Sequence, residues 1–181
     1  MGKLQGMRVY LSGPMDRCPN GGKHWRNWIT PLLKNLGLAV FDPANKPIKT
    51  GVESVEQREY RELLKSNREY NQLSREVRVI SNVDLGMVDI VDFLIVHLDL
   101  EIYPAGTIHE MVIANTQKKP ILLHMEQGKN AVPDWWYGRL PHQEFFDKWE
   151  EILSYLEGIN EGFHKPLSNR WLFFDKEVLV S

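Results

Sequence analysis

The sequence predicts an α/β domain built on a doubly wound parallel sheet. Short apolar runs with β propensity alternate with segments of helical periodicity, which is the order expected of parallel strands joined by crossover helices. The run 92–98 is almost entirely apolar, as is typical of a central parallel strand covered on both faces. With 181 residues, 43% of them hydrophobic and 25% charged, a single globular domain over residues 1–181 is expected.

The expected strands are short runs that mostly end at turn residues. Gly13-Pro14 follows the first run and Asp42-Pro43 follows the second, and both pairs are turn signals. The four strands are predicted at Arg8–Ser12, Leu38–Phe41, Asp92–Leu98 and Pro120–His124.

The expected helices carry apolar residues at a period near 3.6. In the first, from Lys23 to Gly37, Pro31 leaves two interpretations open, a kinked helix or a turn followed by a helix that begins near Pro31. The others are predicted at Val55–Arg78, charged, exposed and broken at Ser66-Asn67, at Asn82–Val91, at Thr107–Gln117 and at Phe145–Leu156.

The segment after Gly158 is a candidate linker, and residues 158–181 form a candidate docking tail. Within it, the stretch Trp171–Val180 is expected to add an edge strand or to dock on a neighbour.

Composition excludes several classes of partner and location. A formal net charge of −2 creates no global field toward nucleic acid or an anionic membrane, so neither is an expected partner. The only cysteine, Cys18, excludes an intramolecular disulfide and fits a reducing compartment. No signal-peptide run and no long apolar segment stand out, and we therefore expect a cytoplasmic protein.

Polar side chains gather where the predicted strands end, which is where open parallel sheets bind ligands. Tyr10 and Gly13 stand at the end of the first strand, with Gly13 allowing a ligand near the backbone, and Asp42 ends the second. Asp84 opens the predicted helix at 82–91, where an aspartate is commonly only a cap. Glu110 lies near a helix amino terminus, which favours an ionised carboxylate able to act as a nucleophile.

Glu110 has a structural interpretation as well as a catalytic one. The spacing Thr107-x-x-Glu110 fits a capping box, in which the glutamate only satisfies a backbone N–H. Local sequence favours that structural interpretation.

Metal and cofactor motifs are missing from the sequence. His97, His109 and His124 have no metal-ligand spacing such as HExxH, so no metal is expected. No GxGxxG is present and no cofactor is expected. Lys23, His24 and Arg26 form only a weak phosphate-binding signal.

Taken together, the motifs resemble the nucleoside 2-deoxyribosyltransferase family, including its relatives that hydrolyse the N-glycosidic bond of nucleoside 5'-monophosphates. The resemblance covers Arg8 to about Met125. It rests on the order of the segments Val9-Tyr-Leu-Ser-Gly-Pro14, Phe41-Asp-Pro43, Asp84-Leu-Gly-Met-Val-Asp-Ile-Val-Asp92, Gly106-Thr-Ile-His-Glu110 and Lys119-Pro120.

The resemblance implies a flavodoxin-like fold and a role for each matching residue. Glu110 corresponds to the family's nucleophile, Asp84 to the aspartate that binds substrate and handles the proton of the base, and Tyr10 to the tyrosine that hydrogen-bonds the nucleophile. A raised pKa is expected to keep Asp84 protonated long enough to assist departure of the base. This raises the catalytic interpretation of Glu110 above the capping one.

The resemblance also implies substrate contacts. Gly13, Asp42 and Gly106 are assigned to substrate binding. Asp99 or Glu101 replaces the family aspartate that contacts the sugar hydroxyls, and Asn130 is the nearest candidate for an asparagine donated by a neighbouring subunit. Aromatic walls for a base are available among Trp25, Trp28, Trp135, Trp136 and Tyr137, the first two being better explained as core residues.

Three functions follow as hypotheses. The first is a transferase that replaces the base of a 2'-deoxynucleoside with a free nucleobase. The second is a hydrolase that splits a nucleoside or deoxynucleoside 5'-monophosphate, supported by Arg17, Lys23, His24 and Arg26 beside the first strand. The third is a nucleotide-binding module without catalysis, in which Glu110 only caps a helix.

A homo-oligomer, a dimer or a dimer-based assembly, is expected with each of these functions. Its interface is predicted at the aromatic cluster Trp135–Tyr137 and the apolar segment Trp171–Phe174. The alternative is that these aromatics cover the open face of the chain's own sheet.

Overall fold

The computed structural model describes residues 2–16, 18, 20–46, 51 and 54–174. Its centre is a parallel sheet of five strands in the order β2-β1-β3-β4-β5. This is the flavodoxin-like order of a doubly wound sheet, so the predicted fold class is confirmed. The strands are β1 (Arg8–Ser12), β2 (Ala39–Phe41), β3 (Phe93–Leu98), β4 (Ile121–Met125) and β5 (Phe145–Phe146).

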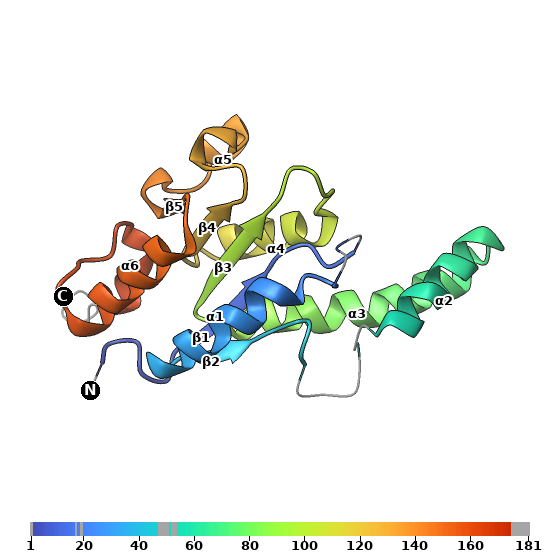
Figure 1. Cartoon of the computed structure of the whole chain (residues 1–181), viewed down its shortest axis with the longest axis horizontal. Coiled ribbons are helices and arrows are strands. Elements are labelled where there is room, and N and C mark those ends of the chain that lie inside the picture. The colour runs from blue at the N-terminus through green and yellow to red at the C-terminus, as the bar shows by residue number, and fades with distance from the viewer. Residues whose placement is uncertain (1, 17, 19, 47–50, 52–53, 175–181) are drawn as a thin grey trace.

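Helices cover both faces of this sheet (Figure 1). One hydrophobic cluster joins alternate residues of the strands to α3 (Tyr70–Ile90), α4 (Ala105–Thr116) and α5 (Asp134–Tyr137). A second cluster joins the other residues of the strands to α1 (Lys23–Asn35) and α6 (Trp149–Glu161). The central strand β3 is therefore buried on both sides, as its apolar run predicts.

The first helix, α1, runs as one element through Pro31. The break predicted at Ser66-Asn67 is also present, because α2 (Val55–Ser66) ends there and Arg68 adopts a positive φ of 59°. A capping box at Ser54 and Gln57 starts α2.

The predicted boundary between helices at 78 and 82 is wrong, because α3 continues without interruption from Tyr70 to Ile90. No proline interrupts this stretch and Gly86 is tolerated within it. Asp84 is consequently an interior helix residue rather than a cap. Figure 1 shows α2 and the first part of α3 extending away from the sheet, with the second part of α3 packed beneath it.

The predicted helix at Phe145–Leu156 is also wrong at its start. Phe145 and Phe146 pair with β4 as the short edge strand β5, and α6 begins at Trp149. Both phenylalanines are buried, one on each face, because side chains alternate along a strand.

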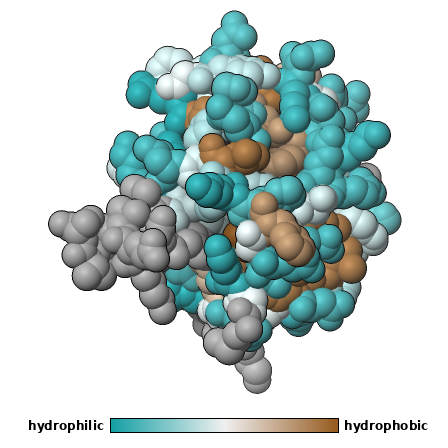
Figure 2. All heavy atoms as spheres, turned by 90° about the vertical axis from the view of Figure 1, so that its left-hand side faces the viewer, coloured by the Kyte–Doolittle hydropathy of each residue, from teal (hydrophilic) through white to brown (hydrophobic). Residues whose placement is uncertain are grey.

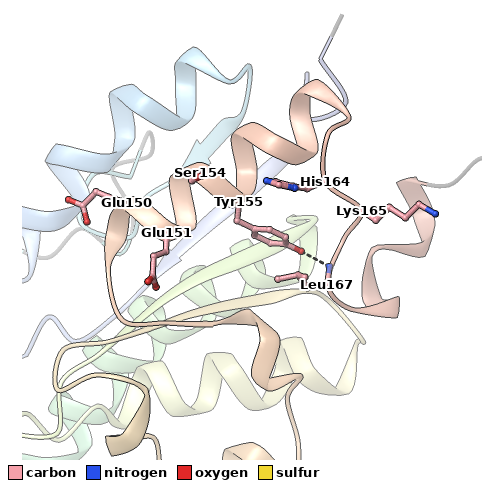
Figure 3. A pocket seen from close by; sticks show the side chains of 7 residues that line it. All are labelled: Glu150, Glu151, Ser154, Tyr155, His164, Lys165 and Leu167. Carbon is pink, nitrogen blue, oxygen red and sulfur yellow. Dashed lines mark hydrogen bonds between the residues drawn. The ribbon is translucent and has the colours of Figure 1, made fainter.

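After α6 the chain turns back over that helix. The ring of His164 lies on Gly158, where a Cβ would stand 1.7 Å from it. The Leu167 N–H donates a 2.9 Å hydrogen bond to the Tyr155 hydroxyl (Figure 3). Residues 169–174 form a 3₁₀ helix instead of an edge strand, and the rest of the predicted stretch, 175–180, lies outside the described residues.

Part of the predicted oligomer interface is used within the chain itself. Trp171 is buried against Phe93, with ring centroids 5.1 Å apart, and Trp136 belongs to the core. Trp135 and Tyr137 stay exposed. On the face shown in Figure 2, hydrophobic side chains form separate patches among hydrophilic ones. The homo-oligomer remains a prediction.

Among the described residues, none of the helices combines the length and apolar character needed to cross a bilayer.

Candidate active site

The Glu110 carboxyl group is buried and held by two hydroxyls of β1. Glu110 lies in the second turn of α4 and is 8% exposed. The Tyr10 hydroxyl donates a 2.8 Å hydrogen bond to Oε1, and the Ser12 hydroxyl donates to Oε2. The capping-box interpretation is wrong, because α4 begins at Ala105 without a side-chain cap and Glu110 is bonded to β1.

Burial raises the pKa values of both Glu110 and Tyr10. Desolvation raises the pKa of Glu110 to about 7, although the hydrogen bonds from Ser12 and Tyr10 oppose the rise. Desolvation and the neighbouring Glu110 raise the pKa of Tyr10 well above its usual value. Tyr10 therefore keeps its proton and serves as a donor that orients the carboxylate.

A pocket of about 300 Å³ opens in front of Glu110. Asp84 of α3 lines the same pocket, so the structure brings together two carboxyl groups that are 26 residues apart in the sequence. Tyr103 and Pro104 of the loop before α4, Gly106 of the first turn of α4 and Arg61 of α2 complete much of its wall.

Asp84 forms an ion pair that no pattern in the sequence predicts. The Lys46 ammonium lies 2.6 Å from Asp84 Oδ1 and also donates to the carbonyl of Gly51 at 2.5 Å. The protonated state expected for Asp84 from sequence stays a prediction. Asp84 lines the pocket, and the Lys46 ammonium is the cation beside its carboxyl group.

Sequence reasoning left four residues of this site without a role. Ser12 follows Tyr10 by two positions in one strand, so period-2 alternation could have placed both side chains on the same face. Lys46 lies in a loop with no motif. Arg61 and Tyr103 reach the pocket from a helix and a loop that no local pattern relates to it.

Arg26 connects Gly13 to Asp42 near the end of β1 through a hydrogen bond and an ion pair. Arg26 is fully buried and donates to the carbonyls of Gly13 and Gly22 at 2.8 and 2.7 Å. Its Nε lies 3.5 Å from Asp42 Oδ1. A Cβ on Gly13 would stand 2.9 Å from the Trp25 ring, which accounts for the glycine without a ligand. Neither Gly13 nor Asp42 is among the described residues that line the pocket.

The phosphate-binding site suggested by sequence near the first strand is not supported by the positions of its residues. Arg26 is engaged by backbone carbonyls, and Lys23 and His24 are exposed and do not line the pocket. Arg17 lies outside the described residues.

The remaining predicted contacts do not converge on the pocket. Asp99 accepts hydrogen bonds from the Glu101 N–H at 3.0 Å and from the Gln127 amide at 2.7 Å. Asn130 is exposed in the short 3₁₀ helix 129–131. Within the described part of the chain, neither Asp99, Glu101 nor Asn130 lines the pocket around Glu110.

The aromatic walls proposed from sequence lie elsewhere. Trp25 stacks on Trp149, with ring centroids 4.9 Å apart, and none of the five aromatics considered lines the pocket in the described residues. Tyr103 does line it and is 81% exposed. A second hollow, between α6 and the returning segment, contains neither Glu110 nor Asp84 (Figure 3).

Several solved structures resemble this chain, among them three with a TM-score above 0.5. The 2-deoxyribosyltransferase from Bacillus psychrosaccharolyticus is 18% identical, with a TM-score of 0.54 over 82% of this chain and 91% of the other. The chain shares the fold of a 2-deoxyribosyltransferase. The 2-deoxyribosyltransferase from Leishmania mexicana is 17% identical, with a TM-score of 0.51 over 83% and 97% of the two chains. A conserved protein from Enterococcus faecalis V583 is 12% identical, with a TM-score of 0.52 over 84% and 98%.

No protein-family model and no curated protein sequence matches the chain. The likeness to the 2-deoxyribosyltransferase fold is therefore structural. It covers 82–84% of the chain, which supports the fold expected from the sequence motifs.

Proposed function

We propose that this chain is an N-glycosyl transferase of the nucleoside 2-deoxyribosyltransferase family that exchanges the base of 2'-deoxynucleosides. The observation that carries the proposal is the buried Glu110 carboxyl, bound through both oxygens by Tyr10 and Ser12 and facing a pocket shared with Asp84. The shared fold of a 2-deoxyribosyltransferase supports it.

The chemistry begins with ionised Glu110. One carboxylate oxygen attacks the anomeric carbon of the sugar, the bond from that carbon to the base nitrogen breaks, and its electron pair leaves with the base. The product is a deoxyribosyl ester on Glu110. A second free base attacks the same carbon, expels the carboxylate and forms the exchanged nucleoside, whereas water in its place releases free deoxyribose.

The leaving base needs a proton as it takes the electron pair. Asp84, the member of the pair that lines the pocket, passes it a proton from the Lys46 ammonium, and the incoming base returns a proton by the same route. Tyr10 and Ser12 hold the nucleophile in place and exchange no protons with the substrate.

Chromatography of a reaction between a 2'-deoxynucleoside and a different free base tests this proposal. We expect the exchanged nucleoside to form and to disappear with Glu110→Ala. Release of deoxyribose without exchange would assign hydrolysis instead, and nucleoside binding without any turnover would assign a binding module.

Arg61 favours a second candidate, hydrolysis of a nucleoside 5'-monophosphate. Arg61 lines the pocket and is 8% exposed, and its guanidinium lies 3.8 Å from the carboxylate of Asp16, whose side chain is largely exposed. A guanidinium at a pocket wall suits a phosphate group.

Arg61→Gln separates the two candidates. If the substrate is a 5'-monophosphate, we expect kcat/KM to fall about 10- to 150-fold for the monophosphate, the loss of a charged hydrogen bond worth about 1.5–3 kcal/mol, and to change little for the nucleoside. Steady-state kinetics on both substrates measure this. Equal effects on the two would exclude phosphate recognition by Arg61, and Arg58→Gln, in the same helix and outside the described pocket lining, is the matched control.

A further inference from the structure

Two histidines meet on the face of the sheet opposite Glu110. His97 of β3 and His124 of β4 are register partners in neighbouring parallel strands. Their Nδ1 atoms lie 3.0 Å apart. Both side chains point to the layer of α1 and α6, where they contact Trp149, whereas Glu110 lies on the side of α3 and α4.

Glu126 supplies a third group. It follows the end of β4, and one ligand atom from each of His97, His124 and Glu126 lies within 4.8 Å of the others. Glu126 Oε2 lies beside the same ring, 3.9 Å from His97 Nε2, the nitrogen that does not face His124. The Glu126 side chain is 55% exposed, which leaves an approach for an ion and for a water ligand from solvent.

The two imidazoles are held in place by aromatic rings. Trp149 stacks on His124, with centroids 4.1 Å apart and planes at 12°. Trp25 stacks on the same indole, and His97 lies 5.6 Å from the Trp25 ring. Such packing fixes the orientation of the ring nitrogens before any ion arrives, as a supporting shell does in metal sites.

The local charges favour a cation. Several carboxylates interact with the two histidines: Glu126 and Asp99 with His97, and Asp147, Glu150 and Glu151 with His124. Among the described residues, the Arg26 guanidinium acts in the opposite direction on His97.

We propose that His97, His124 and Glu126 bind a divalent transition-metal ion of the zinc class. Two imidazole nitrogens and one carboxylate are a known zinc ligand set, with water in the fourth position. Zinc–nitrogen bonds of about 2.0–2.1 Å place two ligand nitrogens roughly 3.3 Å apart, close to the 3.0 Å between the two Nδ1 atoms. The ion would replace the hydrogen bond between these nitrogens, and the proton of that bond would leave to solvent or move to the Nε2 of the same ring.

The sequence offers no HExxH spacing here because the ligands come from two strands. Parallel pairing of β3 with β4 brings together residues 27 positions apart. The bound ion would tie the carboxyl ends of these strands to each other. This site is independent of the function proposed for Glu110.

Titration of the chelator-treated full chain with Co²⁺ tests the site, followed by displacement with Zn²⁺. We expect one saturable Co²⁺ per chain, with the visible absorption of a four- or five-coordinate ion. His97→Gln and His124→Gln should weaken binding at least as much as losing an outer-shell partner does, about 10–100-fold.

Glu126→Gln tests the site with little risk of misfolding, because the Glu126 side chain is exposed. Its loss should weaken binding of the ion without disturbing the core. Zn²⁺ should raise the thermal midpoint of the wild type and raise it less for Glu126→Gln. His142→Gln, at an exposed position, is the matched control and should bind like the wild type. Absence of saturable uptake, or equal affinity in wild type and Glu126→Gln, would overturn the proposal.

Discussion

Glu110→Gln is expected to reduce turnover by at least about 10³-fold, because an amide cannot form the ester that links sugar to enzyme. In the wild type, kcat/KM should rise with pH through about 7, since burial raises the pKa of Glu110 to about 7 and only the carboxylate attacks. Steady-state kinetics between pH 5 and 9 measure both results.

The same substitution should stabilise the protein above pH 7. Folding raises the pKa of Glu110 from 4.5 to about 7, so the folded state holds its proton more tightly than the unfolded state. Stability therefore falls as pH rises from about 4.5 to 7, by an amount on the order of 3 kcal/mol. Glu110→Gln removes this penalty, and the gain should be present at pH 8 and absent at pH 4.5.

Urea unfolding at those two pH values checks the gain in stability. Glu101→Gln, an exposed glutamate on the loop before α4, is the control and should change neither stability nor turnover. Full activity in Glu110→Gln would place the nucleophile elsewhere, and an equal stability change at both pH values would contradict the assignment of the raised pKa.

Glu144→Leu is expected to destabilise the protein by about 3 kcal/mol. Glu144 is fully buried, and its Oε1 accepts hydrogen bonds from Tyr155, Ser168 and Trp171. Leucine leaves these three donors without their acceptor while removing a buried carboxyl, so the net loss is smaller than the sum of three bonds. The Tyr155 hydroxyl also accepts the Leu167 N–H (Figure 3). The Glu144 carboxyl therefore helps to hold the returning segment on α6.

Glu144→Gln is the matched comparison, because it keeps one oxygen acceptor in the same place, and we expect it to lose less than half as much. Thermal unfolding should show a fall of about 6–12 °C for the leucine variant. Equal midpoints for the leucine variant and the wild type would show that the segment is held by the packing of Trp171 alone.

Several features of this protein were determined by the sequence itself. The mostly apolar runs of β1, β3 and β4 indicate parallel strands, because a strand that is buried on both faces is apolar at most of its positions. The motif resemblance placed Tyr10 beside Glu110, and the structure shows that hydrogen bond directly. These features are local in the chain or repeat in a known order.

The tertiary structure decided everything that depends on register between distant segments. Phe145 and Phe146 became a strand because β4 offers an open edge. Asp84 lies inside a long helix because no residue of α3 interrupts its hydrogen bonds, and its partner Lys46 comes from a loop 38 positions away.

Packing between distant segments also brings together the side chains of the candidate active site and of the proposed metal site. Ser12 reaches Glu110 across 98 positions, and His97 meets His124 only through the pairing of β3 with β4. Periodicity tells which face of an element is buried, whereas the partner on that face is set by how the elements pack. The two groups at the carboxyl ends of β1, β3 and β4 therefore follow from the packing of the elements.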